Sequence, residues 1–202
     1  IQEPEDSVVP EDMRDPAEDR WESMPRAVRA LVLLASLAGV AMAVGYIFAL
    51  FPLLDLTYYF LLMAAFLPVV YLLLPAWKGE KGVTWASYAP AILILVLCLI
   101  MAYFARQLVF GTWVPVKEDW QLWVAVGLFV MILEAARRSG GMIFLVIVLV
   151  LSLYPVYAFY MPGMLWGPPT SFARTVAFNV FSNDAMLGVV TRVVAETLIG
   201  FL

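Results

Sequence analysis

Six long apolar runs separated by short charged loops most constrain what this chain can fold into. No Asp, Glu, Lys or Arg occurs in residues 30–54, 56–77, 82–105 or 139–173. A helix of roughly 20 residues crosses a hydrocarbon core of about 30 Å, so each of these windows is long enough to span a bilayer. Hydrophobic residues make up 64% of the chain and charged residues only 14%. We therefore expect most of the protein to lie in a membrane.

The fold class follows from the period of these runs. Only helices and closed barrels satisfy every backbone N–H and C=O group inside lipid. A barrel strand would alternate apolar and polar residues, whereas residues 30–39 and 91–100 are apolar on all sides. The sequence therefore predicts an all-α, polytopic helical membrane protein.

We predict spans at residues 26–51, 55–74, 85–107, 119–138 and 142–160, with a sixth that begins near Asp184. Prolines punctuate them, because proline lacks the N–H that a helix interior needs. Three are expected where the chain leaves a helix (Pro52, Pro75 and Pro115), and three are expected to kink a span (Pro68, Pro90 and Pro155). After a turn-rich connection at 161–169, Thr170 or Ser171 is expected to cap a short helix that runs to Asn179.

Residues 1–25 have a different character and form an acidic tail. This segment has only two basic residues, Arg14 and Arg20. It has nine acidic residues: Glu3, Glu5, Asp6, Glu11, Asp12, Asp15, Glu18, Asp19 and Glu22. Such a segment cannot build a core, so we expect a mobile or surface-lying tail. The net charge of −4 mostly reflects this tail and says little about a partner.

The positions of Lys and Arg predict orientation, because basic residues are held on the cytoplasmic side. With the amino terminus inside, eight basic residues lie inside and three outside. The inside set is Arg14, Arg20, Arg26, Arg29, Lys78, Lys81, Arg137 and Arg138, and the outside set is Arg106, Lys117 and Arg174. We expect a multi-pass membrane protein with a cytoplasmic amino terminus.

The residue inventory argues against an enzyme. The chain has no histidine and one cysteine, which excludes the usual zinc, haem and iron–sulfur ligand sets and nucleophile–histidine catalysis. Gly140–Gly141 lacks the Lys and Ser/Thr of a phosphate-binding loop. We expect no cofactor, no metal site, no bond-making chemistry and no nucleic-acid partner, and we assign Cys98 to packing.

Two groups of charged residues within or beside apolar runs are the candidate structural or interface residues. Glu134 precedes Arg137 and Arg138 by three and four residues, which places both guanidinium groups on its helical face. The cluster either docks an adjoining helix or anionic lipid heads, or simply ends a span by snorkelling to the cytoplasmic surface. Arg192 and Glu196 repeat the spacing nearer mid-span, as a functional pair or as an internal salt bridge.

Two weaker features concern packing and ions. Asn179, Ser182, Asn183 and Asp184 form a polar break whose oxygens suit Na⁺, although a helix N-cap is the plainer interpretation. Gly39 and Ala43 lie four residues apart in the first span, a spacing that lets helices approach closely in lipid.

One stretch of the chain resembles a known family. The run Leu133-Glu-Ala-Ala-Arg-Arg138 follows a fourth span and precedes Gly140-Gly141, another apolar span, 157–160 and Met161-Pro-Gly-Met-Leu165. This arrangement is similar to the fused membrane subunit of tripartite ATP-independent periplasmic (TRAP) transporters, in the group partnered by TAXI-type binding proteins. The resemblance covers residues 26–202 and is most specific between Glu134 and Leu165.

The resemblance implies Na⁺-coupled uptake of an organic acid delivered by a periplasmic substrate-binding protein, through an elevator motion of a large domain against a scaffold. Residues 26–138 would be the four-span, small-subunit-like scaffold, and residues 139–202 would start the transport domain. The remaining helices would lie in the same or another chain. Because Asn183-Asp184-Ala185 stands where the family often has Thr-Glu-Gly, no substrate or sodium role is carried over to it.

Two other functions remain open. One is a non-transporting assembly subunit whose wide apolar faces stabilise partner membrane chains. The other is a membrane enzyme acting on lipid, against which the lack of histidine and of paired carboxylates within spans argues.

Overall fold

The computed structural model describes residues 16–50, 53–77, 80, 82–111, 113, 116 and 118–182. Every regular element in these residues is a helix, as predicted. In chain order they are α1 (Pro16–Ser23), α2 (Arg26–Ile47), α3 (Asp55–Leu73), α4 (Trp85–Gly111), α5 (Asp119–Ser152), α6 (Tyr154–Tyr157), η2 (Ala158–Tyr160), η3 (Gly163–Leu165) and α7 (Phe172–Phe181).

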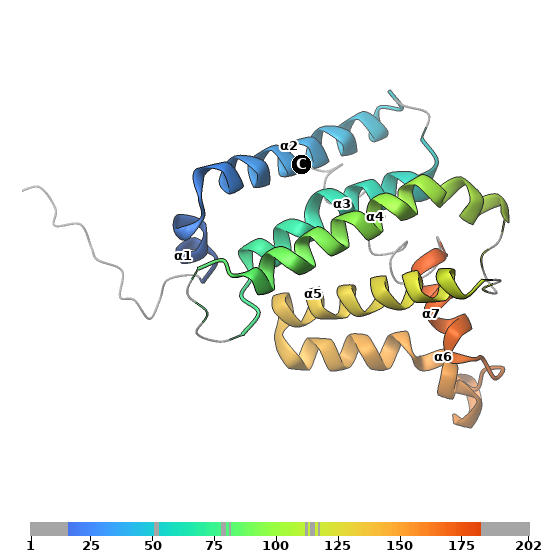
Figure 1. Cartoon of the computed structure of the whole chain (residues 1–202). Coiled ribbons are helices and arrows are strands. Elements are labelled where there is room, and N and C mark those ends of the chain that lie inside the picture. Colours follow the sequence, from blue (N-terminus) through green and yellow to red (C-terminus); the bar gives the residue numbers. More distant parts are fainter. Residues whose placement is uncertain are drawn as a thin grey trace, which may run out of the picture.

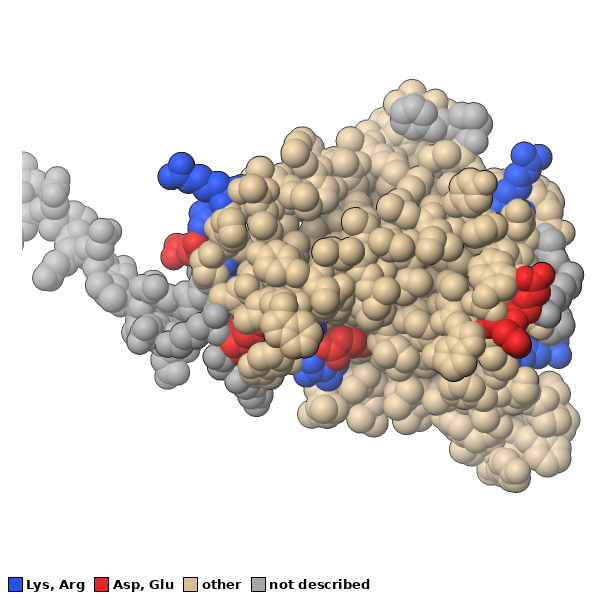
Figure 2. All heavy atoms as spheres, in the orientation of Figure 1, with Lys and Arg blue, Asp and Glu red and all other residues tan. Residues whose placement is uncertain are grey.

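Four of these helices are long and apolar enough to cross a membrane: α2, α3, α4 and α5. They run side by side, with the short helices α1, α6 and α7 at their ends (Figure 1). Most charged side chains lie toward the two ends of the body, and the broad surface between them is uncharged (Figure 2). This is the architecture of a multi-pass helical membrane protein, because lipid contacts the uncharged middle and water contacts the ends.

Helices α3, α4 and α5 enclose the core. Tyr71 of α3, Ile94 and Cys98 of α4 and Leu128 of α5 are all fully buried. Cys98 is therefore a packing residue, as its mid-span position predicted. α3 is the most central of the four spanning helices, with the largest buried share of its apolar window.

α2 packs on α3 through its small residues and turns most of its leucines outward. Gly39 and Ala43 are buried, while Leu34 and Leu37 are about two-thirds exposed at 66% and 67%. A Cβ atom at Gly39 would lie 2.9 Å from the Phe66 ring, so the two helices meet where a side chain is missing. The close approach predicted from the small residues is confirmed.

α5 is a helical hairpin and not one straight helix. Gly141 interrupts it with φ 75° and ψ −172°, a left-handed conformation that glycine adopts without strain. The chain reverses there, so residues 119–140 and 142–152 lie antiparallel, drawn yellow and orange in Figure 1. The fourth predicted span thus ends near residue 138, as expected.

The fifth predicted span, 142–160, is not one continuous helix, and its break lies beside Pro155, where a kink was predicted. The second limb of α5 ends at Ser152, and α6 and η2 follow as separate short turns. Pro155 explains the break, because it has no N–H to donate and its ring would clash with the carbonyl of residue 151. At about 1.5 Å per residue, the limb 142–152 is about half as long as the hydrocarbon core is thick.

Two further predictions fall at the carboxyl-terminal side. α7 begins after Ser171, whose hydroxyl accepts a hydrogen bond from the Arg174 N–H, so the predicted cap is confirmed. The sixth span, which begins near Asp184, lies outside the described residues.

The acidic tail contains structure that composition did not predict. Residues 16–23 form α1, and Arg20 within it is buried at 2% exposure. Met24, directly after α1, joins the hydrophobic core. This part of the predicted surface-lying tail is therefore docked on the bundle, where Arg20 forms a buried ion pair with Glu80.

The α2–α3 contact yields a first prediction. Gly39→Leu should lower the free energy of unfolding by about 1–3 kcal/mol, because the new side chain must displace the Phe66 ring and separate the helices. Val40→Leu, on the neighbouring exposed face, is the matched control and should change little. Denaturant titration in one detergent measures both, and equal effects would contradict the observed contact.

Candidate functional site

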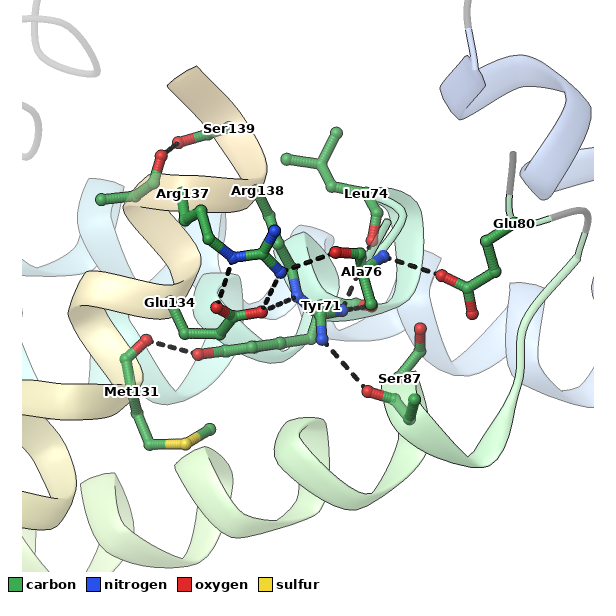
Figure 3. A network of polar contacts seen from close by, with 12 residues as sticks. Tyr71, Leu74, Ala76, Glu80, Ser87, Met131, Glu134, Arg137, Arg138 and Ser139 are labelled. Carbon is green, nitrogen blue, oxygen red and sulfur yellow. Dashed lines mark hydrogen bonds and ion pairs between the residues drawn. The ribbon is translucent and has the colours of Figure 1, made fainter. Parts of the chain in front are cut away.

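The predicted cluster Glu134, Arg137 and Arg138 lies at the end of the first limb of α5, against the end of α3 and the start of α4 (Figure 3). Arg137 donates to Glu134 through Nε at 2.7 Å and Nη2 at 2.6 Å. Arg138 Nε donates to Glu134 Oε1 at 2.9 Å. The predicted shared helical face is confirmed, and one carboxylate holds both guanidinium groups.

Arg138 is the buried member of the cluster. Its side chain is 3% exposed, and its guanidinium reaches three backbone carbonyls outside α5. Nη1 donates to Tyr71 O at 3.3 Å and to Leu74 O at 3.5 Å, and Nη2 donates to Ala86 O at 3.1 Å. The guanidinium carbon also lies 4.8 Å from the centre of the Tyr71 ring, a cation–π contact. One side chain thus joins α3, α4 and α5.

Prolines explain why two of these carbonyls are free to accept. In an α-helix the carbonyl of residue i accepts from the N–H of residue i+4. For Tyr71 that residue is Pro75, and for Ala86 it is Pro90, and proline has no N–H. Both carbonyls would be left without a helical donor, and Arg138 donates to each of them. The sequence therefore supplies the acceptors as well as the donor.

Helix electrostatics add to this arrangement. Tyr71 and Leu74 lie at the carboxyl end of α3, where unpaired carbonyls carry the negative end of the helix dipole. A cation placed there is stabilised, typically by about 0.3–1 kcal/mol and more when partly buried. Arg138 occupies that position, with its charge further balanced by Glu134.

Two additional contacts reinforce the joint. The buried Tyr71 hydroxyl donates to the carbonyl of Met131, which ties α3 to α5 about one turn before Glu134. Arg137 Nη2 donates to Ala76 O at 2.6 Å, and its side chain stays 28% exposed. We call the set of Glu134, Arg137 and Arg138 with the carbonyls that they hold the arginine clasp.

A second ion pair lies beside the clasp. Arg20 Nη1 donates to Glu80 Oε2 at 3.0 Å, with both side chains 2% exposed, and Arg20 Nη2 donates to Ser87 Oγ at 2.8 Å. Burial by itself would raise the pKa of Glu80. Hydrogen bonds from Thr84, from Ala76 N–H and from Arg20 outweigh it and hold the pKa below the ordinary value of 4.5. Glu80 is therefore a stable anion that anchors α1.

The other candidate residues are placed less fully. Arg192 and Glu196, like Asn183 and Asp184, lie outside the described residues. Asn179 is 8% exposed and its Nδ2 donates to Ser152 O at 2.9 Å and to Thr175 O at 3.0 Å. Its amide therefore fastens α7 to the end of α5.

The clasp holds α3, α4 and α5 together, and the carboxylate within it is already occupied by hydrogen bonds. Both Glu134 oxygens accept from arginine, so this carboxylate is poorly placed to act as a base. Within the residues that the structure describes, no group of three His, Cys, Asp or Glu side chains could hold a metal ion. No family model, curated protein or solved structure matches this chain. The role of the clasp therefore has to be argued from its contacts.

Sequence reasoning missed two parts of this site. It assigned Pro75 and Pro90 to helix ends and kinks, but not to the creation of carbonyl acceptors for Arg138. It also missed the pairing of Arg20 with Glu80, 60 residues apart. The i to i+4 relation between each proline and its orphaned carbonyl could have indicated the first, whereas no local signal indicates the second.

Removing Arg138 should be costly. Arg138→Met should lower the free energy of unfolding by about 2–4 kcal/mol, because it strands the carbonyls of Tyr71 and Ala86 at about 1–3 kcal/mol each, while Glu134 keeps its bonds from Arg137. Arg137→Met is the matched control and should lower it by clearly less, because Arg137 is 28% exposed and holds one carbonyl. Denaturant titrations in the same micelles measure both, and a larger loss for Arg137 would contradict the assignment.

The proline argument predicts a specific coupling. Pro90→Ala supplies an N–H that competes for Ala86 O, so it should reduce the loss caused by Arg138→Met by about 1 kcal/mol, the worth of one hydrogen bond. The measurement is a double-mutant cycle on unfolding free energies. Pro68→Ala is the control, because the N–H that it supplies would donate to the carbonyl of residue 64, which Arg138 does not contact, and its cycle should show additivity. Additivity for Pro90 as well would refute the proposed origin of the acceptor.

Proposed function

We propose that this chain is a membrane component of a Na⁺-coupled secondary transporter that takes up an organic acid delivered by a periplasmic binding protein. In this proposal it supplies the scaffold and the first helices of an elevator-type transport domain. The observation that carries it is the run Leu133-Glu-Ala-Ala-Arg-Arg138 at the end of a fourth apolar helix, with the later Met161-Pro-Gly-Met-Leu165, which resembles TRAP subunits. Scaffold residues 26–138 and transport-domain residues 139–202 are the corresponding parts.

The position of the chain reversal supports a boundary after Arg138. The arginine clasp fixes the end of the first limb of α5 to α3 and α4. Only two residues later, at Gly141, the chain turns back. A rigid attachment followed at once by a glycine reversal is what a joint between a static part and a moving part requires.

The two sides of that boundary are also packed differently. Residues 125, 128 and 135 in the first limb are buried in the core. In the second limb Ile143 is 79% exposed and Leu151 67% exposed. Such apolar surface needs lipid or further helices to cover it, which fits a second part that is completed by transport-domain helices.

The charge distribution supports the proposed orientation. Arg20, Arg137 and Arg138 all meet the α3–α4 connection, so these predicted inside residues lie at one end of the bundle. Arg106 lies near the other end of α4. We propose that the arginine end faces the cytoplasm of a cell whose inner membrane holds the protein.

Transport in vesicles tests the proposal. This chain should be reconstituted with the remaining transport-domain helices, in the same or another chain, and with the soluble binding protein. Labelled mono- and dicarboxylic acids should then accumulate only when Na⁺ is higher on the side that holds the binding protein. Replacing Na⁺ with K⁺, or omitting the binding protein, should abolish accumulation.

The controls separate the rival functions. Uptake that needs ATP or proceeds without Na⁺ would overturn the proposal. No uptake of any acid, combined with loss of partner membrane chains when this chain is deleted, would favour a non-transporting assembly subunit.

A further inference from the structure

The helix α1 is tied to the bundle through the connection between α3 and α4 and through the first turn of α4. Between the end of α3 at Leu73 and the start of α4 at Trp85, Pro75 has no N–H to contribute. Ala76 is 6% exposed, so its backbone groups need partners inside the protein. The partners that the structure gives them are side chains: Glu80 of the same connection for the N–H, and Arg137 of α5 for the carbonyl.

Ala76 is held from two sides by two different ion pairs. Its N–H donates to Glu80 Oε2 at 2.7 Å, the oxygen that also accepts from Arg20 of α1. Its carbonyl accepts from Arg137 of α5 at 2.6 Å. Figure 3 shows Ala76 between Glu80 on one side and Arg137 on the other.

A second meeting point lies in the first turn of α4. Ala86 O accepts from Arg138 of α5, and the next residue, Ser87, accepts through Oγ from Arg20 of α1. Ser87 is fully buried. The Arg20–Glu80 pair and the arginine clasp thus form one continuous polar network across α1, α3, α4 and α5.

We propose that α1 is a strap whose docking is energetically coupled to the seating of the α5 hairpin. When Arg20 leaves Glu80, the α3–α4 connection loses the support that positions Ala76 and Ser87, so Arg137 and Arg138 hold their carbonyls less firmly. The reverse also follows, because coupling between two sites is reciprocal. A force that pulls on the acidic segment before α1 would therefore loosen the end of α5 beside Gly141. This inference stands whether or not the chain transports an acid.

Hydrogen–deuterium exchange of the full chain in micelles tests the coupling, since it reports local opening segment by segment. Arg137→Met should speed exchange of the α1 amides at residues 20–24 by about threefold or more, the size expected for neighbours in one network. The hydrogen bonds that the structure describes for Arg137 go to Glu134 and to Ala76 O, both outside α1. Arg20→Met should reciprocally speed exchange at residues 134–140. Arg106→Met, near the opposite end of α4, should change neither segment.

The proposal fails if each substitution alters only its own segment. Should Arg20→Met or Arg137→Met open the whole bundle, Ser87→Ala takes the place of Arg20→Met, because it removes one hydrogen bond to Arg20 and keeps both ion pairs. It must then speed exchange at residues 134–140, and an unchanged rate there overturns the coupling.

Discussion

The structure depends on one buried guanidinium. Arg138 sits at 3% exposure where α3 ends, α4 begins and the first limb of α5 finishes, and it donates to a carboxylate and three carbonyls. A charge taken from water costs several kcal/mol unless its partners are complete. The hydrogen bonds of Arg138 are complete here partly because Pro75 and Pro90 have no N–H, so the carbonyls of Tyr71 and Ala86 are free to accept from the guanidinium. Charge and acceptors are therefore satisfied only in this one arrangement of the three helices.

Such specificity matters more in lipid than in water. Apolar contact alone gives helices little preference for one another, because lipid tails are as apolar as leucine. The packing of α2 on α3 is specific because Gly39 has no side chain and lets the helices approach closely. The packing of α3, α4 and α5 is specific because of the arginine clasp (Figure 3). The second limb of α5 lies beyond the clasp, is held at its far end by Asn179 of α7, and leaves Ile143 and Leu151 largely exposed. The boundary between the helix that the clasp fixes and the helix beyond it falls at Gly141.

Much of this could be predicted from the sequence, because long apolar windows permit little else. The helical fold, the four spanning helices, the contact at Gly39, the Ser171 cap and the shared face of Glu134 with its two arginines all follow from periods of 3.6 residues or from composition. The span predicted at 142–160 is broken beside Pro155, the proline that was expected to kink it, and the break is sharp enough to end the helix at Ser152. Docking of α1 was missed because Arg20 and Glu80 are 60 residues apart, and only the tertiary fold brings them together. The prediction of transport draws on resemblance, whereas the contacts explain how the helices are held.

The most direct test of the account asks on which side of the membrane the clasp lies. The structure places the α3–α4 connection and the end of the first limb of α5 at one end, with the exposed Gln107 near the opposite end of α4. Single cysteines at Trp77, Ser139 and Gln107 should be labelled with a membrane-impermeant maleimide in intact and in permeabilised cells, with Cys98 buried and silent. The account predicts that Trp77→Cys and Ser139→Cys react from the same side and Gln107→Cys from the other. Labelling of positions 77 and 139 from opposite sides would contradict it.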